Sequence, residues 1–333
     1  MADTQELDKD FDGFSNEEYR KIALFAGSDS DLSKLDFTVL NLKFIRLNSP
    51  EFSKFFSETN HFKFGDHNLK FFESYLQHKK NCYLLVPIEL DEDIGDFWLV
   101  RTVLSILFPS DISLVAIIKF QFFDKKYLFR LGSVEHPFQP HGVYGSHFLN
   151  YEEKLLPEIN QFINVFIDRY DKLTYLKRTI ASSYISSFRE RYVRMQYLSL
   201  CISLESIVNG KHELLYRISR YIAIICGNTK NECWVIFKNI EKIYNLRSKI
   251  VHGEEYKDDE VKRFMPYLKG IVSRMIIELI VLNLPDKKTL NDLLTEIGFG
   301  EKDKISKDYK VYDVCPETQD IIKQPINDIR LNK

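Results

Sequence analysis

Apolar residues recur at helical spacing through most of residues 151–285, and this pattern limits the fold more than any other feature of the chain. Between Val193 and Ile207 they follow one another at intervals of four and three residues, which places them on one face of a helix. Short connections between long amphipathic helices favour antiparallel neighbours. We therefore predict an all-α helical bundle for this part of the chain.

The ends of the expected helices are marked by residues that favour caps and stops. Asn209-Gly210 and Gly227-Asn228 follow apolar helical segments, as is common at helix C-termini. Asp258-Asp259 precede the last long apolar stripe, which continues past Pro266. The expected helices cover residues 153–173, 186–208, 213–228, 232–252 and 258–282.

The first 150 residues have the pattern of a mixed α+β domain. Ser15 to Glu18 form a capping-box sequence that predicts the start of a short helix, and Ser49-Pro50 predict another. Residues 136–147 contain the prolines and glycines of a loop. Runs rich in β-branched and aromatic residues predict strands within residues 37–47, 82–90, 112–123 and 125–131.

The length of 333 residues favours more than one domain. We expect an α+β domain at residues 1–150, a helical domain at 151–300 and a loosely packed C-terminal tail at 301–333. The five cysteines are scattered and include no C-x-x-C pair, which argues against a disulfide framework and a zinc ribbon. The N-terminus is acidic and the most apolar runs are interrupted by charges. We therefore expect a cytoplasmic protein without a membrane span.

Opposite charges are concentrated in different parts of the chain. Residues 1–100 contain 11 Lys and Arg against 19 Asp and Glu, whereas residues 171–250 contain 14 against 6. Such asymmetry indicates either a region that binds polyanions beside an acidic one or two solvated faces of opposite sign. An acidic segment that covers the basic region until a trigger arrives is a further hypothesis. Basic residues that could extend an RNA-binding track are Arg189, Arg191, Arg194, Arg217 and Arg220.

Arg247 occupies a position that the apolar pattern reserves for the core. It continues the stripe of Ile236, Ile240 and Ile243 at helical intervals. Because an unpaired buried guanidinium is very costly, it must pair with an acid or line a groove that admits an anion. Glu205 lies on a similarly apolar helix face and is the candidate partner. Spacing alone leaves a structural ion pair and a ligand-binding arginine equally open.

His252 follows Arg247 by five residues, near the expected helix end at Gly253. On an ideal helix this spacing corresponds to about 140° of rotation and about 7.5 Å of rise, so the two side chains are not stacked neighbours. They can converge on one ligand only if the arginine extends along the helix axis. A histidine near a helix end is more often a partner of the helix dipole than a catalyst.

These residues nevertheless resemble a known motif. Residues 247–252, RSKIVH, match the R-x4-6-H motif of the HEPN superfamily. With the upstream sequences SLCISLESIV and LLYRISRYIAIICG, the segment YNLRSKIVHG resembles the Apea-like branch known from bacterial anti-phage proteins. The resemblance covers roughly residues 185–285 and implies a HEPN-like helical bundle. It departs from the commonest pattern at Ser248, where active members often have Asn, Asp or His.

The resemblance implies a metal-independent endoribonuclease that needs no cofactor, acts as a homodimer and serves as a toxin or anti-phage effector. Its partners would be RNA, with tRNA one candidate, and a phage-derived or protein trigger. His252 would move protons while the RNA 2′-hydroxyl attacks the phosphate, and Arg247 would hold the phosphate charge. The products would carry 2′,3′-cyclic phosphates. Supporting roles would fall to Glu205, Tyr244, Ser248 and Lys249.

Three other interpretations stay open. A HEPN bundle can serve as a non-catalytic module that binds nucleotides or proteins. A nucleotidyltransferase in the N-terminal half would need two alternating carboxylates after Gly27-Ser28, but Asp36 is followed by Thr38 at the second position. A zinc site is the third interpretation, although the spacing of its ligands fits no standard pattern; these would be His136, His141 and His147.

Overall fold

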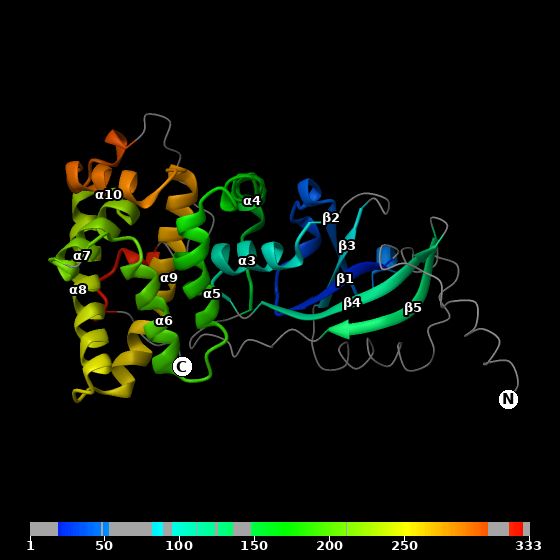
Figure 1. Cartoon of the computed structure of the whole chain (residues 1–333), viewed down its shortest axis with the longest axis horizontal. Coiled ribbons are helices and arrows are strands. Elements are labelled where there is room, and N and C mark those ends of the chain that lie inside the picture. The colour runs from blue at the N-terminus through cyan, green and yellow to red at the C-terminus, as the bar shows by residue number, and fades with distance from the viewer. Residues whose placement is uncertain are drawn as a thin grey trace, which may run out of the picture.

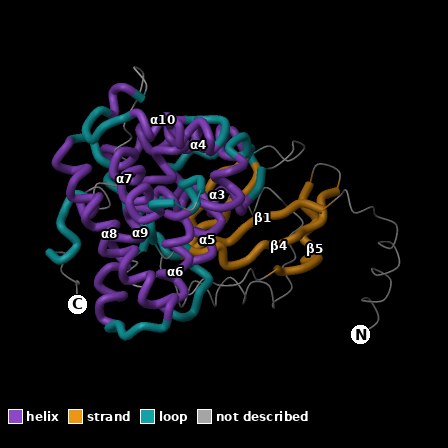
Figure 2. The backbone as a smooth tube through the Cα atoms, turned by 60° about the vertical axis from the view of Figure 1, so that its left-hand side comes forward, coloured by secondary structure: helices purple, strands orange, loops and turns teal. Residues whose placement is uncertain are grey.

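The computed structural model describes most of the chain, and everything stated about the structure below refers to this part. The described residues are 19–47, 49–52, 82–88, 95–110, 112–123, 126–135, 148–210, 212–305 and 320–328. The strands lie on one side of the molecule and most of the helices on the other, as Figures 1 and 2 show. The expected α+β part followed by a helical part is therefore confirmed.

Five antiparallel strands form one sheet in the order β2-β3-β1-β4-β5. The central strand β1 pairs with β3 on one side and with β4 on the other, and its apolar residues from Ile22 to Ala26 are buried. Runs of Val, Ile, Phe and Tyr favour this pleated, covered geometry. The strands are β1 (Tyr19–Ala26), β2 (Leu42–Arg46), β3 (Cys82–Pro87), β4 (Ser113–Phe123) and β5 (Lys126–Glu135).

Helix α3 (Phe97–Leu107) lies between the sheet and the helical part (Figure 1). Asp96 begins it by accepting a hydrogen bond from the Trp98 N–H. Two buried hydroxyls attach α3 to the helices, because Tyr184 donates to the Ser105 carbonyl and Ser273 donates to the Ile106 carbonyl. Side chains of both parts belong to one hydrophobic core cluster. The division into domains at residue 150 therefore stays a prediction.

The helical part packs around α9, whose residues from Phe264 to Ile280 are almost all buried. Among the helices of this part, α7 and α8 make the most extensive contact, followed by α5 with α6 and then by α6 with α9. Its elements are α4 (Leu156–Tyr170), a π-helical segment (Leu176–Ala181), α5 (Ser182–Ser187), α6 (Val193–Glu205), α7 (Leu214–Cys226), α8 (Lys230–His252), α9 (Asp258–Leu282) and α10 (Lys287–Glu296). Short 3-10 turns occupy Leu32–Lys34, Thr38–Leu40, Glu153–Leu155 and Lys302–Lys304.

Several expected elements differ in the structure. Residues 19–26 form strand β1 directly after the capping-box sequence, so the short helix expected there is wrong. The strand expected over residues 37–47 is shortened to Leu42–Arg46, because a 3-10 turn precedes it and Asn41 adopts a left-handed conformation with φ of 54°. Helices α3 and α10 were not expected. The loop expected at residues 136–147 lies outside the described residues.

The single helix expected over residues 186–208 is also wrong, since α5 ends at Ser187 and α6 begins at Val193. Burial of Phe188 and contacts between nearby residues accompany the interruption. Phe188 is buried beside Tyr184, and the Gln196 side chain donates to the Glu190 carbonyl ahead of α6. These contacts stabilise a turn where the helical spacing alone predicts continuity.

The C-terminal tail is packed where the structure describes it. Ile322 and Ile326 are buried, and Asn239 on α8 bonds to the backbone of Gln324 and Ile326. The expectation of a loosely packed tail is therefore wrong for these residues. Among the described helices, none combines the length and the hydropathy needed to cross a lipid bilayer.

Candidate functional site

Helix α8 ends where the R-x4-H sequence ends. Thr229 caps its start by accepting the Glu232 N–H, and Gly253 follows its last residue with φ of 71°. Glycine adopts this left-handed conformation at little cost. The N–H groups of Gly253 and Glu254 both donate to the Lys249 carbonyl and close the helix. His252 is thus the last residue of α8, and it is exposed.

Arg247 and Glu205 form the ion pair that their positions on the two apolar stripes predict. The Arg247 Nε atom lies 2.7 Å from Glu205 Oε1, and Nη2 donates to Oε2 at 3.1 Å. The side chains are only 23% and 21% exposed. Oε1 is buried and accepts no directed hydrogen bond from the described residues, so its close contact with Nε is mainly electrostatic. The arginine therefore joins the end of α6 to α8.

The surroundings of the pair are apolar enough to oppose its charges. Burial raises the pKa of Glu205, although Arg247 acts in the opposite direction. Burial also raises the pKa of the Cys201 thiol, one turn earlier on α6, well above its usual range, and Glu205 adds to this shift. The Tyr244 ring lies beside the arginine, with 5.5 Å between its centroid and Arg247 Cζ. The Tyr244 ring adds a cation–π interaction to the ion pair and so further stabilises the Arg247 guanidinium.

The pairing leaves part of the guanidinium available. A guanidinium has five N–H donors, and Glu205 engages only the edge formed by Nε and Nη2. No described residue accepts a hydrogen bond from Nη1 of Arg247. This second edge has the geometry that binds two oxygens of a phosphate or carboxylate.

His252 is not in contact with the ion pair. No hydrogen bond or ion pair of its imidazole is present among the described residues, and the side chain projects from the last turn of α8. Ser248 is half-buried and makes no side-chain hydrogen bond in the described part of the chain. The structure therefore brings Glu205, Tyr244 and Arg247 together but leaves His252 apart from them.

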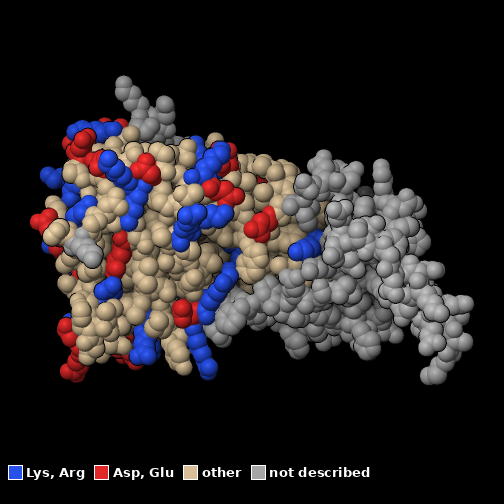
Figure 3. Space-filling model, in the orientation of Figure 1, with Lys and Arg blue, Asp and Glu red and all other residues tan. Residues whose placement is uncertain are grey.

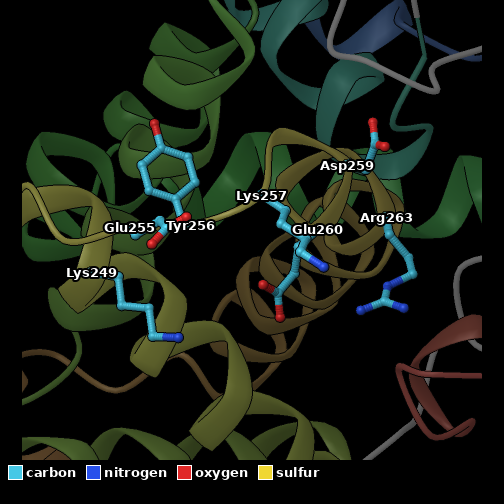
Figure 4. A pocket seen from close by; sticks show the side chains of 7 residues that line it. All are labelled: Lys249, Glu255, Tyr256, Lys257, Asp259, Glu260 and Arg263. Carbon is cyan, nitrogen blue, oxygen red and sulfur yellow. The ribbon is translucent and has the colours of Figure 1, made fainter.

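Lys249 faces away from Arg247, because two residues on a helix correspond to about 200° of rotation. It lines an open groove between α8 and α9, as Figure 4 shows, together with Glu260 and Arg263. The groove has a volume of about 810 Å³ and is also lined by the connecting segment from Glu255 to Lys257. Neither Arg247 nor His252 lines it. This geometry therefore does not favour a supporting role for Lys249 at the Arg247 site.

The basic residues expected to extend an RNA track divide into two groups. Arg217 donates to the Asn209 carbonyl and Arg220 donates to the carbonyls of Leu294 and Ile297, so both mainly attach α7 to neighbouring segments. The other basic residues are exposed near the start of α6; these are Arg189, Arg191 and Arg194. Figure 3 shows blue side chains over the lower end of α5 on the face in view.

The structure gives little support to the two remaining interpretations, a nucleotidyltransferase and a zinc site. Asp36 accepts hydrogen bonds from the Thr38 N–H and hydroxyl, which is a local turn contact. In the part of the chain that the structure describes, no three His, Cys, Asp or Glu side chains are grouped as metal ligands. The candidate zinc ligands lie outside the described residues; these are His136, His141 and His147.

Comparison of the chain with protein-family models, with curated proteins and with solved structures found no match. The fold and the ion-paired site thus define the class of protein only as an α+β sheet part joined to a helical part.

The Glu205–Arg247 pair is expected to contribute about 1–2 kcal/mol of coupling free energy to folding, because its side chains are mostly withdrawn from solvent. A double-mutant cycle with Glu205→Gln and Arg247→Gln, read by urea unfolding, measures this value. The exposed Lys238–Glu241 pair on the same α8 is the matched control, with an expected coupling below about 0.5 kcal/mol. Equal coupling in the two pairs would contradict the structural role of Glu205.

Proposed function

We propose that the helical part is a metal-independent endoribonuclease of the HEPN type, acting in the cytoplasm as a toxin or anti-phage effector. The observation that supports the proposal is how the Arg247 guanidinium is bound. Glu205 holds it from one edge, and its other edge makes no hydrogen bond to the described residues. An arginine that was only structural would be expected to use more of its donors inside the protein.

The chemistry suits these residue types. The RNA 2′-hydroxyl is an internal nucleophile, so cleavage needs a group that moves protons and a cation that stabilises the growing phosphate charge. An exposed histidine such as His252 can donate and accept protons at a bound substrate. The free edge of Arg247 binds the phosphate oxygens. DNA is not cleaved because it lacks the 2′-hydroxyl.

A second copy of the chain brings a histidine and an arginine to the same phosphate, which one copy does not do. In one copy His252 and Arg247 are not in contact. Exposed apolar residues lie three residues before Glu205 and four residues after Arg247, spacings that place them on the same helix faces as the pair. Ile202 on α6 and Val251 on α8 are 48% and 49% exposed. Apolar surface beside a charged pair is typical of an interface between subunits. In the dimer the two R-x4-H motifs face one cleft, where histidine and arginine act on the same phosphate.

A non-catalytic module is the second candidate. The separation of His252 from Arg247 within one copy favours it, and so does Ser248 after the motif arginine. In this case the free edge of Arg247 binds the phosphate of a nucleotide without cleaving it, and substitution of His252 leaves binding unchanged.

Incubation of the purified protein with total cellular RNA in excess chelator tests the proposal. We expect RNA fragments with 2′,3′-cyclic phosphate ends and no cleavage of a DNA oligonucleotide of the same sequence. The same reaction after heat denaturation of the protein is the control for contaminating nuclease. Intact RNA together with nucleotide binding that is lost in Arg247→Gln would support the non-catalytic module instead.

A further inference from the structure

Helix α3 carries a buried cation without an acidic partner. Arg101 is only 3% exposed, yet its guanidinium forms no ion pair and no hydrogen bond with any described residue. Burial and a neighbouring cation lower the pKa of Arg101 to about 10.

The neighbouring cation belongs to a different part of the fold. Arg189 follows α5, in the turn that interrupts the expected long helix, and its Cζ lies 5.5 Å from the centroid of the Trp98 ring. Arg101 Cζ lies 5.7 Å from the same centroid. Trp98 is 37% exposed. Two guanidiniums are therefore held around one accessible aromatic ring, where α3 meets the connection that leads to α6.

No acidic side chain in the described part of the chain neutralises this cluster. Asp96 is one turn away on α3, but its carboxylate caps the helix at the Trp98 N–H. Glu190 follows Arg189, and no ion pair of either arginine is present within the described part of the chain. Interaction with an aromatic ring offsets only part of the cost of burying a guanidinium. Two guanidiniums at one ring, without a counter-charge among the described residues, provide the donors that a dianion needs.

We infer that Arg101, Arg189 and Trp98 form a binding site for a small phosphate-bearing anion, separate from the Arg247 site. Two guanidinium groups match the two negative charges of a phosphate monoester or of inorganic phosphate. The partly exposed ring adds an apolar surface that the nucleoside contacts when the phosphate belongs to a nucleotide. Because α3 and the segment before α6 both contribute, the bound anion holds the sheet part against the helical part. The inference does not depend on the proposed ribonuclease activity.

Tryptophan fluorescence reports this site directly, because the chain contains only two tryptophans, Trp98 and Trp234. In a Trp234→Phe background, titration with inorganic phosphate and, separately, with adenosine monophosphate is expected to change Trp98 emission saturably. Sodium chloride of equal ionic strength is the salt control. Binding of both ligands with equal affinity would identify phosphate as the recognised group, whereas tighter binding of the nucleotide would add a contact between its nucleoside and Trp98.

Arg101→Met and Arg189→Gln are each expected to weaken this binding about 10- to 100-fold, the loss expected for a charge-assisted hydrogen bond. Arg191→Gln is the matched control, because Arg191 is exposed two residues away and no contact with Trp98 is present. Unchanged affinity in Arg101→Met, or no saturable response of wild-type Trp98 to either ligand, would overturn the inference.

The thermal stability of Arg101→Met separates a ligand site from a structural role. In phosphate-free buffer this variant is expected to unfold about 2–4 °C above the wild type, because it removes an unpaired buried charge and keeps a side chain of similar length. Added phosphate is expected to raise the unfolding temperature of the wild type and not that of the variant. A variant that unfolds at a lower temperature in both buffers would assign Arg101 to packing alone.

Discussion

Replacing His252 with alanine is expected to lower RNA cleavage by about 10²- to 10⁴-fold, the usual contribution of a group that transfers protons during catalysis. His252 is exposed at the end of α8, so the same change is expected to alter the free energy of unfolding by less than about 1 kcal/mol. The measurement is the rate of cleavage of a fluorescently labelled RNA in excess chelator. A large loss of activity in a fully folded variant would assign the histidine to the chemistry.

His212→Ala is the matched control, since His212 is also exposed in the helical part but lies before α7, outside the R-x4-H sequence. Its activity is expected to equal that of the wild type. The complementary change Arg247→Lys keeps the positive charge but loses the guanidinium edge, and is expected to lower activity while retaining part of the contact with Glu205. Cleavage by His252→Ala at the wild-type rate would refute the proposed mechanism.

Replacing Glu278 with glutamine is expected to reduce the free energy of unfolding by about 3–5 kcal/mol, the cost of breaking a buried ion pair on one side. Glu278 on α9 is 1% exposed and pairs with Arg274, which is 3% exposed. Lys302 Nζ lies 3.1 Å from the same carboxylate oxygen, and its side chain is 8% exposed. Burial lowers the pKa of Lys302 even beside Glu278. Glu278→Gln therefore removes the carboxylate that both buried cations share.

The matched control for Glu278 has the same spacing on a different helix. Asp168 and Lys172 are also four residues apart, but both side chains are 66% exposed. Asp168→Asn is expected to leave the free energy of unfolding almost unchanged. Urea unfolding of the two variants compares buried and exposed pairs directly, and equal losses would contradict the burial argument.

Replacing Arg274, Glu278 and Lys302 together tests whether unbalanced charge, rather than lost packing, causes the destabilisation expected for Glu278→Gln. The variant with Arg274→Met, Glu278→Leu and Lys302→Met is expected to be about as stable as the wild type, because apolar side chains of similar volume need no charge partner. A loss as large as that of Glu278→Gln would mean that the packing of the side chains, rather than their charge balance, carries the stability.

The sequence predicted the features that depend on neighbours along the chain. Helical spacing identified the helical part, β-branched runs identified strands β3, β4 and β5, and Gly253 marked the end of α8. The Glu205–Arg247 contact also followed from spacing, because each charge occupies an apolar stripe and each needs the other. These are consequences of local backbone preference and of the cost of burying single charges.

The sequence did not predict features that depend on which elements meet in space. Strand β1 and helix α3 follow weak local signals and are stabilised by the sheet and the helices that cover them. The turn between α5 and α6 interrupts a helical pattern because Phe188 packs beside Tyr184 and Arg189 reaches Trp98. Arg101 and Glu278 looked only like charges that interrupt apolar runs.

By itself, the sequence determined the class of fold and the end of α8, since spacing and residue type decide these features, and it offered Glu205 as one candidate partner of Arg247. Only the tertiary structure decided that one edge of Arg247 makes no hydrogen bond to the described residues and that His252 stands apart from it. It also decided that Glu278 is held between two cations and that Arg101 and Arg189 meet at Trp98. The physical reason is that the environment of a charge depends on residues far away in the chain, and those are brought to it only when the core packs.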